Sequence, residues 1–431
     1  MAPSRWSVDV TRSLLILVLL TGCSGGDNPP PSSSSNPPPG TGPGGVSTGQ
    51  PGRFNDRVTA IIAAPDTSGD IYVAGYFSTY SNRPVQQVVR LRPDGTLNES
   101  FTLAAEVAPT RFGVTSLAPV DDGSGDIYVG FVTNIGLEPP SRVVRIWKVN
   151  PDGSVDASFP RGEVTYSRAE TVFNTNIHTI VPVGDGSGRA YVCGVFDRYN
   201  AVAVSHIVLV TPTGTLDPTF QSVADPTYTV IPSDDGSGDL YVMNWRLFDI
   251  TSRTNGSTDV YRLNADGSVD PAFIRRTTLP YGELHAVLPV ADGTGDIFIG
   301  GTFIVNGTSP PTSPENNPSA FSSLVRVNAD GSLDLNSPRP AVNDFITRMV
   351  RAVDGTRDIL IVNPIHVMRF KPDSSTDPAF MTGTAEQRIF TLLPVPDGTG
   401  DLYVGGDITA YNGVSVGKIV RLNGNGTLDG R

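Results

Sequence analysis

The sequence has few of the residues on which disulfide, metal and redox chemistry depend. Its 431 residues include two cysteines, four histidines and three tryptophans. Cys23 and Cys193 can form at most one disulfide, and none if Cys23 is modified in another way. A disulfide framework is therefore excluded. Trp147 and Trp245 are the only tryptophans beyond the first residues, too few for a stacked cofactor platform of the quinoprotein kind.

Clusters of basic residues and long apolar runs are also missing. The chain has 31 Lys and Arg against 43 Asp and Glu, and its net charge of −12 argues against a nucleic-acid partner, because phosphate binding needs a concentrated basic surface. The apolar run from Ser13 to Leu20 is too short to cross a bilayer as a helix of the mature protein. Gly (46) and Pro (37) are abundant instead, as in chains of many short strands joined by tight turns.

The first residues are expected to be a targeting signal. Arg5 and Arg12 precede the apolar run, as in the leader of an exported protein. Leu20-Thr21-Gly22-Cys23 resembles a bacterial lipobox. The resemblance implies that residues 1–22 are a signal peptide and that Cys23 is the lipid attachment site, carrying fatty acyl chains such as palmitate. It also implies sorting to the outer membrane, because Ser24 rather than Asp follows the cysteine. The alternative is a secreted protein cut nearby, with Cys23 left free.

A tether is expected to follow. Residues 23–52 are almost entirely Gly, Pro, Ser, Asn and Thr, a composition that cannot bury a core. Such a segment holds a folded domain away from the membrane surface, so membrane attachment is expected through the lipid anchor alone.

One short phrase recurs seven times in the remaining chain. An apolar stretch and a Gly/Asp turn precede Gly-Asp-Ile-Tyr-Val or a variant of it, and the copies lie 43 to 63 residues apart. The copies begin at Asp70, Asp126, Arg189, Asp239, Asp296, Asp358 and Asp401. A β-type repeat of this length predicts an all-β protein, a seven-bladed β-propeller over residues 53–431 with one four-stranded blade per repeat.

The first copy shows the four expected strands. Val58 to Ala64, Asp70 to Phe77 and Val85 to Leu91 are apolar and β-prone, and Asp94-Gly95 then turns the chain into Thr96-Leu97-Asn98. Asp-Gly is a strong hairpin signal because the turn needs a positive φ. Copy six breaks this pattern with Asp373-Ser374.

The repeat resembles the bacterial delta-60 repeat family, a propeller-forming domain of unknown function. The matching pieces are Asp-Gly-(Ser/Thr)-Gly-Asp-(Ile/Leu)-Tyr-Val-Gly-Gly and Val-Arg-Leu-Asn-x-(Asp/Asn)-Gly-(Ser/Thr)-(Leu/Val)-Asp-x-x-Phe, over about residues 54–431. The resemblance implies a fold but no function, since propellers include enzymes, scaffolds and binding proteins.

Comparing the copies predicts a structural role for most of the charged residues. Six copies have Asp where the second strand opens, and copy three has Arg189. The base four residues before the second turn is missing only in copy three, which has Leu209. We therefore expect cross-strand ion pairs, each contributing about 0.2–1 kcal/mol. The pairs singled out are Asp70 with Arg90, Asp239 with Arg262, and Asp401 with Arg421.

Candidate catalytic groups are scarce. His178 and His285 share one repeat position, where the other copies have Thr59, Thr115, Tyr228, Thr347 and Phe390. If the first strand is innermost, two imidazoles facing a central channel would hold a metal or an anion; the alternative is a polar ring without a ligand. No catalytic residue is assigned, because the familiar nucleophile, zinc and phosphate-loop motifs are missing from the sequence.

Two other features have plainer explanations. Turns such as Asp121 to Asp126 resemble calcium loops, but turn chemistry accounts for their residues, so no cofactor is expected and calcium is left as the alternative. Cys193 stands at a strand position where other copies have Ala or Gly, and a small buried thiol is expected there rather than a nucleophile.

The two ends of the repeat array are expected to meet. Five copies end in Asp or Asn, two residues and Phe, but copy five has Ser337 at that place and the seventh copy runs out at Leu428-Asp429-Gly430-Arg431. Phe54 precedes the first copy with no repeat before it. Phe54 is therefore predicted to complete the seventh copy and to lie beside residues 427–431.

These features favour a monomeric, lipid-anchored protein of the bacterial cell envelope whose propeller binds or scaffolds an envelope protein or glycan. The segment from Val305 to Ser322 is its most individual surface. The alternative is a metal-dependent hydrolase or lactonase with its site at the mouth of the channel.

Overall fold

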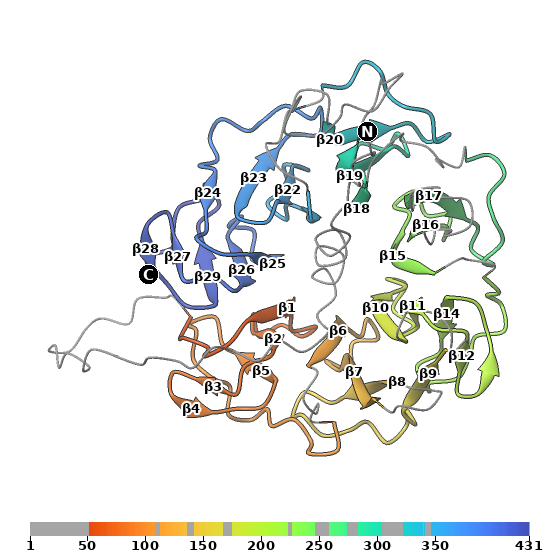
Figure 1. Cartoon of the computed structure of the whole chain (residues 1–431), viewed down its shortest axis with the longest axis horizontal. Helices are drawn as coiled ribbons and strands as arrows, with labels where there is room; N and C mark the ends of the chain where they lie inside the picture. Colours follow the sequence, from red (N-terminus) through yellow and green to blue (C-terminus); the bar gives the residue numbers. More distant parts are fainter. Residues whose placement is uncertain are drawn as a thin grey trace, which may run out of the picture.

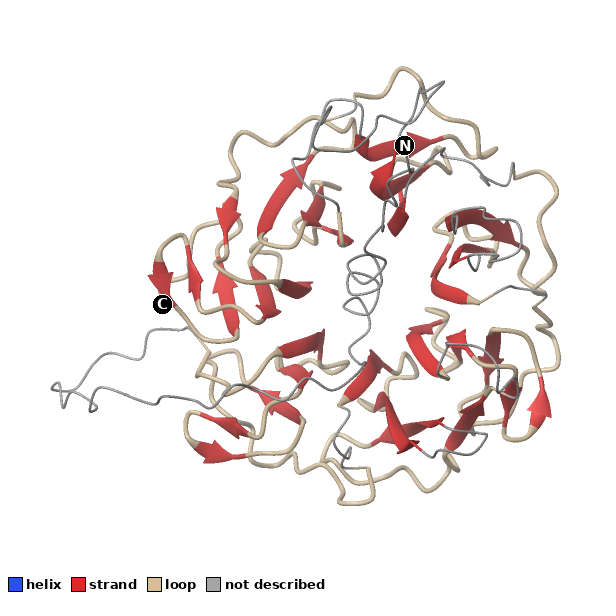
Figure 2. Cartoon of the chain, in the orientation of Figure 1, coloured by secondary structure: helices blue, strands red, loops and turns tan. Residues whose placement is uncertain are grey.

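The computed structural model describes residues 51–107, 113–135, 142–166, 175–222, 226–245, 258–273, 283–303, 322–338, 340 and 346–430. Secondary structure within these ranges consists of β-strands, turns and bends (Figure 2). No helix in the described ranges is long and apolar enough to cross a membrane. The all-β prediction is therefore confirmed for the described chain.

Each repeat contributes three antiparallel strands to a small sheet. The first strands lie nearest the centre of a ring and form its inner wall (Figure 1). They are β1 (Val58–Ala63), β6 (Val114–Pro119), β10 (Asn176–Pro182), β15 (Thr227–Pro232), β18 (Glu283–Pro289), β21 (Arg348–Arg351) and β25 (Ile389–Pro394). The middle strands are β2 (Ile71–Gly75), β7 (Ile127–Ile135), β11 (Ala190–Val195), β16 (Leu240–Trp245), β19 (Ile297–Phe303), β22 (Ile359–Val362) and β26 (Leu402–Gly406). The third strands are β5 (Val88–Leu91), β8 (Arg142–Val149), β14 (Ile207–Val210), β17 (Thr258–Leu263), β20 (Ser322–Val327), β23 (His366–Phe370) and β29 (Ile419–Leu422).

The prediction of a fourth strand after the second turn is corrected by the structure. After the second turn, Leu97 forms only an isolated bridge with Leu91, and the other six repeats repeat this bridge. The chain then bends because the Asn98 side chain accepts hydrogen bonds from the amide and hydroxyl groups of Ser100. This bend places Phe101 against Tyr72, with ring centroids 5.2 Å apart. An aromatic contact takes the place of further pairing.

Short peripheral strands lie outside the third strands in part of the ring. They are β3 (Thr79–Tyr80), β4 (Arg83–Pro84), β9 (Gly162–Thr165), β12 (Arg198–Tyr199), β13 (Val202–Ala203), β24 (Gly383–Thr384), β27 (Ala410–Tyr411) and β28 (Val414–Ser415). Strand β9, which follows repeat two, pairs with β8 of its own repeat and with β12 of repeat three. A peripheral strand thus joins two neighbouring repeats.

Apolar packing runs around the whole ring. In the described residues, seven buried clusters each combine side chains of two neighbouring repeats. The cluster between repeats seven and one contains Val58 and Ile61 of β1 together with Val395, Tyr403 and Ile419. The junction between the first and last repeats is therefore packed in the same way as the other six.

The prediction that Phe54 takes the place of the repeat-ending Phe is also corrected. Phe54 bridges Tyr80, just as Val164 pairs with Tyr199 and Ala385 bridges Tyr411. It is therefore equivalent to the peripheral strand that follows a repeat, and lies five residues beyond the position of the repeat-ending Phe. In the described part of the predicted neighbour segment, residues 427–430, no residue pairs with Phe54, and Leu428 bridges Leu422 within repeat seven.

The chain start nevertheless adjoins repeat seven. Arg53 donates from Nη2 to Ser415 Oγ at 3.5 Å, and a Cβ on Gly417 would lie 3.3 Å from the Gly52 carbonyl oxygen. Phe54 shares its buried cluster with Tyr403. The chain start thus pairs with repeat one through Phe54 and also lies against repeat seven.

Candidate functional site

The seven positions predicted to form a ring coincide with a backbone irregularity of the inner wall. Six inner strands have a register shift at this position, and β21 begins one residue after it. The residues are Thr59, Thr115, His178, Tyr228, His285, Thr347 and Phe390. A bulged residue is unpaired and its side chain is re-aimed, and the six described side chains at this level are partly exposed. We call it the bulge end of the inner wall.

The two histidines do not form a cationic pair. Burial lowers the pKa of His285 to about 4, so this imidazole is neutral near pH 7. His178 and His285 belong to repeats three and five, with repeat four between them. At the same level, the Thr59 and Thr347 hydroxyls donate to the strand carbonyls of Ala74 and Val362, at 3.3 and 3.0 Å.

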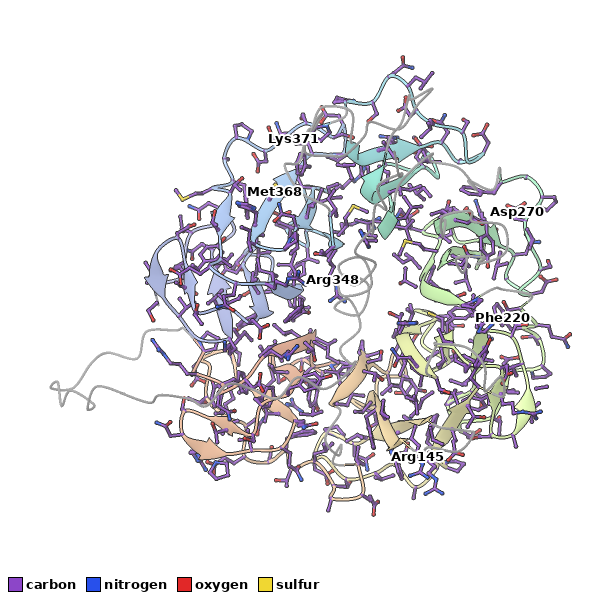
Figure 3. The ribbon with its side chains drawn as sticks, viewed as in Figure 1. Arg145, Phe220, Asp270, Arg348, Met368 and Lys371 are labelled. Atoms are coloured by element: carbon purple, nitrogen blue, oxygen red, sulfur yellow. The ribbon has the colours of Figure 1, made fainter. Side chains whose placement is uncertain are left out.

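Arg348 is a functional candidate that the sequence comparison missed. It opens β21, is exposed, and lies at the inner edge of the ring (Figure 3). Its Nη1 donates to the Phe390 carbonyl oxygen at 3.3 Å. Nearby protein atoms reduce the hydration of the guanidinium, and this desolvation lowers the pKa of Arg348. The signal in the sequence was the appearance of Arg in one copy at a position where the others have Ala, Ser or Thr.

The opposite end of the repeats carries the predicted ion pairs, and the structure brings their members together. Arg90 Nε lies 2.7 Å from Asp70, Arg262 Nε lies 2.8 Å from Asp239, and Arg421 Nη2 lies 2.9 Å from Asp401. Arg90 also lies over the ring of Tyr72. These carboxylates are held at the strand ends and do not converge on the centre of the ring.

Each base binds more carboxylates than the sequence comparison predicted. Lys148 Nζ lies 3.1–3.2 Å from Asp122, Asp126 and Asp156, which come from the turn, the second strand and the repeat end. Repeats four to seven have the same arrangement around Arg262, Arg326, Arg369 and Arg421. Three carboxylates around one cation leave each of these clusters with a formal charge of −2. This end of the ring, the turn end, therefore carries most of the acidic excess.

Repeat three contains a related cluster in which the cation stands at the start of the second strand and not on the third. Arg189 stands where the other repeats have the strand Asp, and its Nη atoms contact Asp185 at 2.7 Å and Asp217 at 3.0 Å. The missing base is replaced by Leu209, which is buried. Hydrogen bonds from Ser187 and Arg189 lower the pKa of Asp185 to about 2. A cation on the second strand thus replaces one on the third.

The turns that resemble calcium loops engage their own backbone and that of a neighbour. Asp122 accepts a hydrogen bond from the Ser124 amide at 2.8 Å. Asp121 accepts from the amides of Gly184 and Gly188 in the next repeat, at 2.6 and 2.8 Å. Among the residues that the structure describes, no group of three or more His, Cys, Asp or Glu side chains is placed to hold a metal ion.

Cys193 is fully buried in β11, and burial raises the pKa of its thiol to about 12. A thiol in this setting is not a nucleophile at neutral pH. Several other features singled out in the sequence lie outside the described residues: the leader, Cys23, the tether as far as residue 50, and residues 305–321.

Comparison with known proteins adds information on the fold. Five segments match a family described as "Domain of unknown function (DUF5122) beta-propeller", namely residues 67–101, 140–159, 186–220, 249–273 and 397–430. The chain is similar to this propeller family. The first segment starts in the turn after β1 and ends at Phe101, so the match includes the turn, the ion pair and the aromatic contact. No curated protein matches the chain.

Proposed function

We propose that the chain is an acylated lipoprotein of the bacterial cell envelope whose β-propeller binds an envelope protein or glycan. The lipobox-like Leu20-Thr21-Gly22-Cys23 after an apolar run supports the anchor, and residues 23–52 have the composition of a tether. Ser24 favours the outer membrane. A cysteine carrying several acyl chains is a stable anchor, because each buried methylene contributes about 0.8 kcal/mol.

The proposed propeller has seven blades, one for each repeat. Seven interrepeat clusters support this number. Strand β9 supplies a fourth strand beside β8, and the contacts of Gly52 and Arg53 with repeat seven support a similar role for the chain start. A ring closed in this way leaves fewer strand edges open to other chains.

Binding rather than catalysis is favoured chiefly by how the repeat uses its charged side chains. The turn, strand and repeat-end acids surround a base of their own repeat, as around Lys148, so they serve the fold. Individual side chains differ mainly at the bulge end and in the segments between repeats, including residues 305–322. A monomeric binding module with a constant framework and variable surface segments fits this division.

Two measurements test the proposal. The Cys23→Ala variant should lose membrane fractionation and metabolic labelling with palmitate, while the wild type retains both. The full-length protein in detergent should then capture the same partner from repeated envelope extracts, and capture should fail with unfolded bait. Unchanged labelling of the variant would contradict the anchor, and the lack of any reproducible partner would contradict the binding role.

A further inference from the structure

Strand β21 differs from the other six inner strands at two positions. Arg348 pairs with Val362 in the register where the other repeats place small residues. Those residues are Ala60, Ser116, Thr179, Thr229, Ala286 and Thr391. Arg351 pairs with Ile359 where the other repeats have Ala63 or a proline. Repeat six therefore puts two arginines on the inner wall of an acidic protein.

The register explains why the position of Arg348 is otherwise small. Ser116 Oγ accepts a hydrogen bond from the Ile180 amide of the next inner strand at 3.0 Å, so this position faces the narrow junction between two inner strands. An arginine does not fit such a junction. Arg348 is exposed instead, and reaches along the wall to the Phe390 carbonyl oxygen of repeat seven.

The two arginines differ in how their charges are balanced. Arg351 Nη2 lies 2.9 Å from Asp234 and also donates to the Pro289 carbonyl oxygen at 2.9 Å. Arg348 has no carboxylate within ion-pair distance in the described part of the chain, and one of its five N–H groups is engaged. By contrast, the base in each ion-pair cluster of the turn end lies close to two or three carboxylates. Arg348 is thus an exposed cation of the inner wall without a counter-ion from the described chain.

Such a cation is suited to an anionic ligand. The planar fork of a guanidinium matches the two oxygens of a carboxylate or phosphate, and charge-assisted hydrogen bonds of this kind are stronger than neutral ones.

We propose that the bulge end of the inner wall binds an anionic group, a carboxylate or a phosphate, and that the Arg348 guanidinium anchors it. The inference deepens the proposed binding role, because it assigns a ligand chemistry to one part of the propeller. The acidic clusters lie at the turn end, the opposite end of the repeats from this anchor.

The test compares two arginine variants of the full-length protein in detergent. Arg348→Thr introduces the residue that three other repeats already have at this register, so the fold is expected to be kept. Arg198→Thr is the matched control, because Arg198 is also exposed and also donates from Nη1 to one backbone carbonyl, that of Ala201, at 3.1 Å. Calorimetry measures binding of inorganic phosphate and, separately, of succinate, which distinguishes the two anion classes.

The wild type should bind at least one of the two anions, and Arg348→Thr should weaken that binding about tenfold or more, as expected for loss of one charge-assisted pair. Arg198→Thr should bind as the wild type does. The bound anion should also slow modification of Arg348 by phenylglyoxal without slowing that of Arg198. Binding of neither anion, or equal binding by wild type and Arg348→Thr, overturns the proposal. Partner capture is scored separately, so a failure of the anion site is distinguishable from a failure of the binding role.

Discussion

The hydroxyls of Ser337 and Ser374 lie 2.9 Å apart, and each serine replaces a residue that the other repeats hold nearly constant. In four other pairs of neighbouring repeats, the turn glycine of one repeat lies against the end of the previous one. Gly214 faces Phe159 and Gly426 faces Phe380, where a Cβ would come within about 3 Å of the ring. Repeat five has Ser337 in place of Phe, and repeat six has Ser374 in place of Gly. Ser337 is smaller than the usual Phe and leaves room for Ser374, which is larger than the usual Gly. The two substitutions therefore compensate each other.

This compensation predicts a strong coupling between the two positions. Ser337→Phe alone should destabilise the protein, because the aromatic ring meets the Ser374 side chain, which is buried. Combining it with Ser374→Gly restores the arrangement of the other repeats and relieves the positive φ of 68° at a non-glycine residue. A double-mutant cycle by chemical denaturation should give a favourable coupling of about 0.5–3 kcal/mol. Additive effects would show that the two serines are independent.

Repeat three offers a second pair of coupled changes. Arg189→Asp should place three carboxylates together without a cation and destabilise the protein by about 1–3 kcal/mol. Adding Leu209→Arg should recover much of the loss, because it rebuilds the charge order of the other repeats around a base on the third strand. The free energy of unfolding of the two single variants and the double variant measures this. A double variant no more stable than Arg189→Asp would contradict the interpretation that Arg189 replaces the base of the third strand.

These examples show which features were readable from the sequence. The turns, strands and Asp–base pairs recur at a constant spacing, so seven copies located them without a structure. In copy three, the sequence predicted only that a pair was lost. Arg189 binds Asp217 because the repeat end folds back beside the second strand, a tertiary relationship that no local pattern carries. Likewise, Arg348 was visible as an unusual residue only once the strand register was known.

The register of Phe54 could not be predicted for a related reason. Five residues separate Phe159 from Val164 and Phe380 from Ala385, but no sequence motif marks the peripheral strand, so this spacing was visible only once the pairing was known. Aromatic identity suggested the repeat-ending Phe, whereas backbone pairing places Phe54 with Val164 and Ala385. The expected fourth strand failed because side-chain hydrogen bonds at Asn98 redirect the backbone, a local competition with sheet pairing.

Stability should depend on pH through His285. The folded pKa of about 4 lies below the ordinary value of 6.5, so the unfolded chain takes up a proton at a pH at which the folded chain does not. Stability should therefore fall as the pH drops from about 6.5 to 4, by about 1–2 kcal/mol between pH 7 and 5. His285→Phe, which introduces the residue type of Phe390, should remove this contribution. Denaturation curves at both pH values compare the variant with the wild type, and an unchanged slope would assign the effect to other groups.

Cys193 should resist thiol reagents in the native state. The side chain is fully buried, and its pKa of about 12 leaves almost no thiolate at pH 8. Mass spectrometry after treatment with iodoacetamide should find Cys193 unmodified in native protein and modified after denaturation. Rapid native labelling would mean that repeat three opens locally. Cys193→Ala should retain full partner binding, as expected of a packing residue.

The closing segment at Phe54 provides the sharpest test of how the ring is held. Phe54 is buried, with ring centroids 4.0 Å from Phe77 and 4.6 Å from Tyr80, and its neighbours Gly52 and Arg53 lie against repeat seven. Phe54→Ala should therefore cost about 3–5 kcal/mol. Phe54→Val should cost less, because repeat three accepts Val164 at the equivalent place.

Loss of stability alone does not locate the effect, so hydrogen exchange supplies the second measurement. Phe54→Ala should speed exchange from Ser415 to Gly417 of repeat seven, because Arg53 and Gly52, which lie against this segment, are loosened. Phe101→Ala removes an aromatic ring of similar burial from repeat one and is the matched control. It should destabilise the protein without selectively exposing Ser415 to Gly417, since Phe101 belongs to the cluster between repeats one and two. Equal exchange in repeat seven for both variants would show that the ring is closed by contacts other than those of the chain start.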